Sequence, residues 1–205
     1  LPLAGVWGGA ESTYPEYMAK FNAGNAATTL RSVAPPPVAS NDIRNEIAAV
    51  HVQGNVHMLV GAGANIAVQI GEEGVLVVDT GAAVSRDKVL AAVRKLSTKP
   101  IRWLINTSGD TDHTGGNETV SQAGQTLNGN SPAIVAHEGV LARMTETNRA
   151  VTERPLNTYF EDSRDFFFNG EAIFLHHFDG HTNGDSIVYF RGSDVVVMGD
   201  MFLTT

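Results

Sequence analysis

The chain has 205 residues, a formal net charge of −8 and no cysteine. An acidic chain without a basic stripe is not typical of proteins that bind a nucleic-acid backbone or an anionic membrane surface. The absence of cysteine excludes disulfides, thiolate nucleophiles and cysteine-ligated zinc. The longest apolar runs have the length of strands, so we expect no membrane span.

The first 45 residues lack a regular hydrophobic period and contain three consecutive prolines, Pro35 to Pro37, which favour extended backbone. We interpret residues 1–45 as an N-terminal arm or linker with a short helix at 14–21, and residues 46–205 as the folded domain. The chain starts at Leu1 without an initiator Met, as an exported protein does after signal removal. We therefore expect a periplasmic or extracellular location and leave a cytoplasmic one open.

From residue 47 onward, short β-branched runs separated by glycines predict a meander of antiparallel strands. These runs are residues 50–52, 56–60, 66–70 and 75–78. Apolar residues at helical spacing then predict a helix over residues 84–96 with Ser85 as its N-cap.

The rest of the chain alternates strands with a few helices. The predicted elements are a strand at 101–105, a helix after Gly116, a strand at 133–136, a helix at 138–151, and strands at 165–168, 172–177, 187–190 and 195–198. This order indicates an α+β domain in which two sheets pack together with helices outside.

Residues 106–116 read Asn-Thr-Ser-Gly-Asp-Thr-Asp-His-Thr-Gly-Gly and follow a strand directly. Asp110, Asp112 and His113 therefore lie within four positions of a glycine-rich loop. A metal ion needs oxygen and nitrogen donors that converge in this way. The loop is the strongest functional signal in the chain.

This loop resembles the His-x-His-x-Asp-His signature of the metallo-β-lactamase superfamily. Asp112 and His113 match the signature, whereas Ser108 and Asp110 stand at the positions of its first two histidines. Three more segments resemble the same superfamily in order and spacing: residues 75–81 with the Asp-Thr-Gly turn at Asp79, residues 180–186 with Gly-His-Thr at His181, and residues 196–200 ending at Asp200.

The resemblance implies a four-layer αββα sandwich with a metal site at one edge between the sheets. It also implies that Asp110, Asp112, His113, His181 and Asp200 converge in one cleft as metal ligands, with Asp200 as the bridging ligand and Asp112 in a catalytic role. Ser108 is a poor zinc ligand, and a carboxylate at Asp110 shifts the preference toward harder ions.

Five further residues are expected to support this site or line its pocket without binding metal. Asp79 is interpreted as a turn residue behind the ligands, Asp185 as a brace for the His181 loop, and His137 as a helix cap or pocket wall. Ser108 and Asn183 complete this set.

The implied function is metal-dependent hydrolysis of an ester, amide or thioester of a small molecule through a metal-activated water. One or two divalent ions are expected, zinc first and iron second. A metal-free pseudo-enzyme or binding module on the same fold, and an iron-containing oxidoreductase-like protein, are the alternatives. Because the resemblance predicts a further helix and strand after Asp200, we also expect a C-terminal fragment of the same protein, cleaved near Thr205, to complete the fold.

Overall fold

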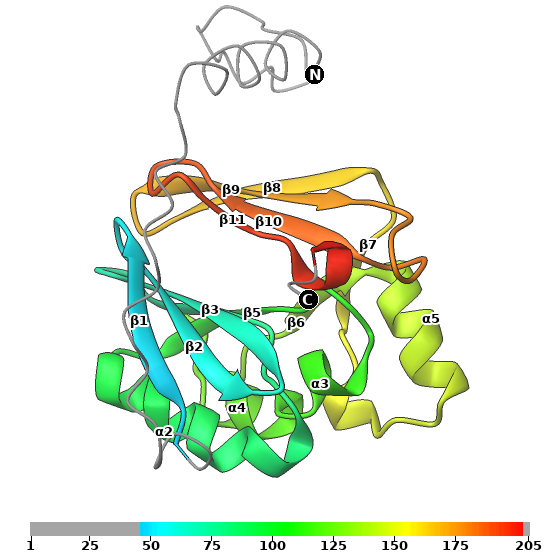
Figure 1. The fold of residues 1–205 in the computed structure, drawn as a ribbon, viewed down its shortest axis with the longest axis horizontal. Helices are drawn as coiled ribbons and strands as arrows, with labels where there is room; N and C mark the ends of the chain where they lie inside the picture. The colour runs from blue at the N-terminus through cyan, green and yellow to red at the C-terminus, as the bar shows by residue number, and fades with distance from the viewer. Residues whose placement is uncertain (1–45, 203–205) are drawn as a thin grey trace, which may run out of the picture. The chain divides into compact units, whose positions relative to one another are not determined.

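The computed structural model describes residues 46–202, and the predicted arm with its helix at 14–21 lies outside the described residues. The described part contains a seven-stranded sheet and a four-stranded sheet that face each other (Figure 1). The strands of the larger sheet, in spatial order, are β1 (Ala48–Gln53), β2 (Val56–Ala62), β3 (Ala64–Gly71), β4 (Gly74–Val78), β5 (Ile101–Ile105), β6 (Ile134–His137) and β7 (Asn157–Tyr159). Those of the smaller sheet are β11 (Val195–Val197), β10 (Ser186–Phe190), β9 (Glu171–His177) and β8 (Ser163–Phe168).

The larger sheet changes from antiparallel to parallel at β4. Strands β1 to β4 form the predicted meander, whereas β4, β5, β6 and β7 pair in parallel. Parallel neighbours need crossover connections, and helices supply them here. β4 is buried at every position, as expected of a central strand that is covered on both faces.

Within residues 46–202, three helices pack against one face of the larger sheet. They are α2 (Arg86–Leu96), α4 (Asn117–Gln122) and α5 (Glu138–Glu146). In α2, Val89, Ala92 and Val93 repeat at helical spacing and join the buried cluster beneath β2 to β6. No helix within residues 46–202 is long and apolar enough to cross a membrane.

The main core lies between the two sheets. On β9, Ile173 and Leu175 point inward and are fully buried, whereas the alternate residue Phe174 is only half-buried. They meet Leu76 and Val78 of β4, which gives the alternating inner faces of a sheet sandwich. The predicted α+β αββα fold is confirmed, and residues 46–202 provide its helical layer and both sheets.

The parallel strands bring their carboxyl ends to one edge, where ligands bind in open α/β sheets. Asp79 follows β4, residues 106–116 follow β5, and His137 ends β6. Asp200 follows β11, and His181 lies between β9 and β10. The topology therefore gathers these loops at one edge of the sandwich.

Three local predictions need correction. The helix predicted over residues 138–151 ends at Glu146, because Asn148 adopts a φ of 53° and stops it. Ser85 makes no side-chain capping bond, since the 3₁₀ turn Ala83–Ser85 already leads into α2. The three-residue strand β7 was not predicted, because only Tyr159 in it is a buried apolar residue.

Candidate metal centre

Asp79 is a buried residue at the base of the site. It directly follows β4, has a φ of 64° and is 1% exposed. Its Oδ1 accepts the Thr107 backbone N–H at 2.8 Å, and its Oδ2 accepts the Thr107 hydroxyl at 2.6 Å. A buried carboxylate needs such donors, so the Asp79 carboxylate ties the end of β4 to the loop after β5.

His113 lies between two carboxylates, with one ring nitrogen facing each. Nδ1 is 2.9 Å from Asp79 Oδ2, and Nε2 is 3.0 Å from Asp200 Oδ1. Burial alone would lower the pKa of His113, but the charges of both carboxylates and the hydrogen bonds to them raise it to about 10. In the metal-free protein, His113 is therefore an imidazolium that links the two acids.

Asp110 is the N-cap residue of the four-residue helix α3 (Thr111–Thr114). Its carboxylate forms an ion pair with the guanidinium of Arg143. Arg143 on α5 donates Nε at 2.9 Å and Nη2 at 2.5 Å to Asp110 Oδ1. Both bonds end on one oxygen, so Oδ2 remains available on the opposite side. That oxygen is 3.3 Å from His181 Nδ1.

The His181 loop is braced by Asp185, as expected. The Asp185 carboxylate accepts the Thr182 N–H at 2.7 Å and the Thr182 hydroxyl at 2.5 Å. Asp185 is buried, whereas the His181 side chain is 55% exposed. The loop is therefore anchored next to His181, while the imidazole itself stays accessible.

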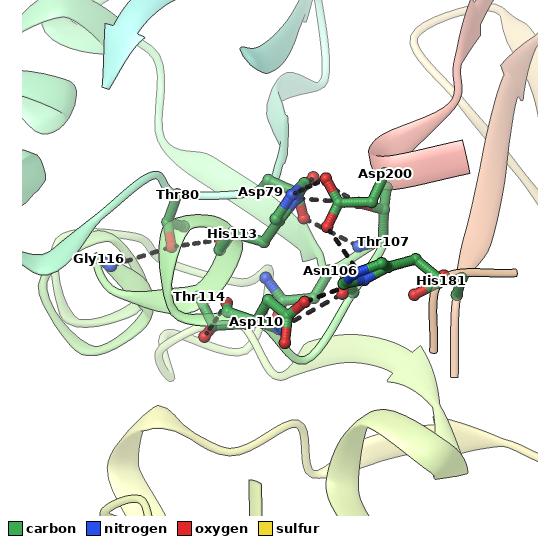
Figure 2. A network of polar contacts seen from close by, with 12 residues as sticks. Asp79, Thr80, Asn106, Thr107, Asp110, His113, Thr114, Gly116, His181 and Asp200 are labelled. Carbon is green, nitrogen blue, oxygen red and sulfur yellow. Dashed lines mark hydrogen bonds and ion pairs between the residues drawn. The ribbon is translucent and has the colours of Figure 1, made fainter. Parts of the chain in front are cut away.

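Asp110, His181 and Asp200 form a group that can hold a metal ion. One donor atom from each lies within 4.8 Å of the other two, and Figure 2 shows the three side chains converging from separate loops. His181 Nδ1 is 3.9 Å from Asp200 Oδ2. Two carboxylates and one imidazole that converge in this way make a suitable donor set for a divalent ion.

Asp112 lies beside this group but is not a member of it. Among the described residues, its carboxylate has no hydrogen-bond or ion-pair partner, and it lines two cavities that both also reach Asp200. The five predicted ligands therefore lie close together. Asp112 lines the cavities, and His113 contacts Asp200 through Nε2.

The other predicted residues lie around this group. Ser108 is fully buried, and its hydroxyl accepts the Asp110 N–H at 3.4 Å. His137 caps α5 by accepting the Gly139 N–H at 3.3 Å. Its ring stacks on His177, with ring centroids 3.6 Å apart, and burial followed by the His177 charge lowers the pKa of His137. Asn183 offers its backbone carbonyl to His177 Nε2 at 3.1 Å.

Two arginines and a threonine were missed from the sequence. Arg143 contacts Asp110, Arg149 lines the same cavity, and Thr107 bonds Asp79. Thr107 lies inside the signature loop, two residues after the end of the buried strand β5. That position was the signal that could have identified it. Nothing local distinguishes Arg143 from an ordinary helix-surface arginine, because only the packing of α5 brings it to the site.

Comparison with known proteins agrees with this architecture. A family model described as the metallo-β-lactamase superfamily matches residues 59–205. No curated protein sequence matches the chain.

Solved structures of metallo-β-lactamases share the fold at low identity. One from Legionella gormanii has a TM-score of 0.62 at 14% identity, and the match covers 79% of this chain and 67% of the Legionella chain. One from Cronobacter sakazakii has a TM-score of 0.59 at 14% identity, with 73% and 61% covered. A class B3 di-zinc enzyme from an Alaskan soil metagenome has a TM-score of 0.58 at 18% identity, with 76% and 61% covered. The chain thus spans less than two thirds of the length of the last two.

Proposed function

Because the chain belongs to the metallo-β-lactamase superfamily, we propose that it is a metal-dependent hydrolase acting on an ester, amide or thioester of a small molecule. The observation that carries this proposal is the convergence of Asp110, His181 and Asp200 at one cavity, with Asp200 also lining a second cavity. Convergent polar groups at a cleft are the usual mark of a small-molecule site.

Asp110, His181 and Asp200 are the residues that would hold the ion. Two oxygen donors and one nitrogen donor suit zinc, and they also suit harder ions such as iron or manganese. When bound, such an ion polarises a carbonyl group and lowers the pKa of a water molecule to about 7.

The chain's own residues then have distinct roles. The carboxylate of Asp112 has no described partner and faces both cavities, so it can accept a proton from an attacking water and return it to the leaving group. Arg143 holds Asp110 in place through Oδ1, and Asp79 holds His113 against Asp200. Arg143 and Asp79 thus orient the donor side chains, as residues that contact metal ligands commonly do.

A metal-free binding module is the second candidate, and a specific observation favours it. Asp110 already pairs with Arg143, and Asp200 already pairs with His113. Ser108 replaces the expected imidazole with a buried hydroxyl. The donors are thus neutralised by the protein itself, which would keep the fold stable without an ion.

Hydrolysis by chelator-stripped and reloaded protein separates these candidates. We expect activity on 4-nitrophenyl acetate or an acyl thioester to return with Zn²⁺, Mn²⁺ or Fe²⁺. His181→Ala and Asp200→Asn should each reduce it at least about 100-fold, because each removes a donor. Asp165→Asn, at an exposed aspartate on β8, is the matched control and should keep full activity. Activity that survives both chelation and His181→Ala would contradict the proposal.

A further inference from the structure

Two cavities border Asp112 and Asp200, and one of them also borders Asp110 and His181. The inter-sheet cavity has a volume of about 460 Å³ and lies between β2, β3 and the end of β11. The arginine cavity has a volume of about 570 Å³ and lies between α3, α5 and the His181 loop. Asp112 and Asp200 line both cavities, so a molecule bound at the metal donors can extend into either one.

The walls of the inter-sheet cavity are mainly apolar. The side chains that line it and remain accessible include those of Val52, Met58, Val197, Met198 and Phe202. His57 also lines it, and its Nδ1 is a buried side-chain atom without a hydrogen-bond partner among the described residues. Such a cavity favours an apolar group.

The arginine cavity has a different chemistry, because Arg143 and Arg149 both line it. Arg149 is fixed by Glu153 at 2.7 Å and by the Thr114 hydroxyl at 3.2 Å. Arg143 uses Nε and Nη2 on Asp110, and its Nη1 donates to no described residue. Arg143 is therefore positioned to bind an anion with its remaining amino group.

The charges that line the arginine cavity also favour an anion once a metal is bound. Asp110, Asp112 and Asp200 contribute three negative charges, and the two arginines contribute two positive charges. A divalent ion at the donor group changes this balance from −1 to +1. A carboxylate there would meet a net positive field in a partly closed site.

We propose that the substrate carries an apolar group and a carboxylate on opposite sides of the bond that is cleaved. The apolar group occupies the inter-sheet cavity, and the carboxylate faces Arg143 in the arginine cavity. This inference rests on the proposed hydrolase function. For an ester, the oxygen of water bonds to the acyl carbon and the acyl C–O bond breaks. One proton of the water goes to the leaving oxygen, and the other leaves with the acid product.

A matched set of chromogenic esters tests this arrangement. Acetyl, butanoyl and octanoyl esters of 4-hydroxy-3-nitrobenzoate carry an anionic leaving group, and the same esters of 2-nitrophenol lack the carboxylate. With metal-loaded protein we expect kcat/KM to be about tenfold higher for the carboxylate series. We also expect it to rise about threefold with each added methylene group until the cavity is filled.

Binding of an uncleavable analogue provides a readout that does not depend on catalysis. The octyl ether of 4-hydroxy-3-nitrobenzoate should bind metal-loaded protein about tenfold more tightly than the octyl ether of 2-nitrophenol, as measured by calorimetry. Arg143→Gln should remove most of this ratio. Arg191→Gln, at an exposed arginine after β10, should not change it. The ratio is taken within one variant, so a general loss of folded or metal-loaded protein does not affect it.

A second pair of variants tests the inter-sheet cavity. Met58→Glu places a charge in the cavity and should abolish the preference for octanoyl over acetyl esters. Val60→Glu, on the same strand but outside the cavity lining, should keep that preference.

The outcomes separate the two proposals. Octyl ethers that bind with the expected preference for the carboxylate, lost in Arg143→Gln, together with esters that are not cleaved, support the two-cavity assignment and contradict the hydrolase. Esters cleaved without dependence on charge or chain length support the hydrolase and overturn the two-cavity assignment. Failure to bind either octyl ether also overturns it.

Discussion

Two of the three metal donors in this protein already have a partner outside the donor group. Arg143 holds Asp110, and His113 holds Asp200. An incoming ion must therefore share Asp110 with a guanidinium and displace or share the proton between His113 and Asp200. Metal binding to such a set releases protons and depends on pH.

Asp79 offers a test of how much the buried charge network stabilises the fold. Asparagine tolerates positive φ as aspartate does, so Asp79→Asn removes the charge while the backbone can stay as it is. We expect chemical denaturation to show a loss of about 3 kcal/mol, since His113 and Thr107 lose their anionic partner. Asp194→Asn is the matched control, because Asp194 is exposed with a φ of 53°. Equal effects of the two substitutions would refute the proposed role of Asp79.

The raised pKa of His113 gives the metal-free protein a pH-dependent stability. Its pKa is about 10 in the folded protein and has the ordinary histidine value of 6.5 in the unfolded chain. The stabilisation is therefore complete below pH 6.5 and is lost as the pH rises toward 10. Unfolding free energies of chelator-treated wild type and His113→Gln should converge across this window, and curves that stay parallel would contradict the assignment.

At the scale of elements, α5 positions two parts of the site together. It carries Arg143, and its first turn packs against the loop that holds His181. A Cβ on Gly184 would lie 2.5 Å from the Val140 backbone nitrogen, and one on Gly139 would lie 2.5 Å from the Asn183 carbonyl oxygen. This glycine-to-glycine contact and the stack of His137 on His177 fix the loop to the helix.

Gly184→Ala should therefore move the His181 loop. The added methyl group meets backbone that cannot shift easily, so we expect a loss of about 1–3 kcal/mol in thermal or chemical unfolding. Metal affinity should fall as well, because His181 moves relative to Asp110. Gly170→Asn is the comparison, since nothing lies within 4 Å of a Cβ there. A Gly184→Ala protein with unchanged stability and metal affinity would show that this contact does not position the loop.

The elements that the sequence predicted well are those with a strong hydrophobic period. β4 is apolar throughout and α2 carries an apolar stripe, so both were predicted nearly to their ends. Their order also placed Asp110, His181 and Asp200 at one edge. The contacts of Arg143 and the close approach at Gly184 depend on how α5 packs, which has no local signal. The end of α5 at Glu146 likewise depends on the backbone of Asn148.

In the domain as a whole, residues 46–202 form the two-sheet sandwich, and the family model places the chain in the metallo-β-lactamase superfamily. The solved structures match at 14% to 19% identity, a level that supports the fold alone. The candidate donor group of this chain consists of two carboxylates and one histidine. We therefore expect this group to bind a metal ion.

Metal content measured on the folded protein shows whether this group binds an ion. Chelator-treated protein is dialysed against Zn²⁺, Mn²⁺ or Fe²⁺ and then analysed by elemental mass spectrometry. We predict about one tightly bound ion per chain for at least one of these metals. Binding should be lost in a combined Asp110→Asn and His181→Ala variant and kept in Asp165→Asn. A folded protein that takes up no ion, or that binds it equally well without Asp110 and His181, would show that these residues do not form a metal site.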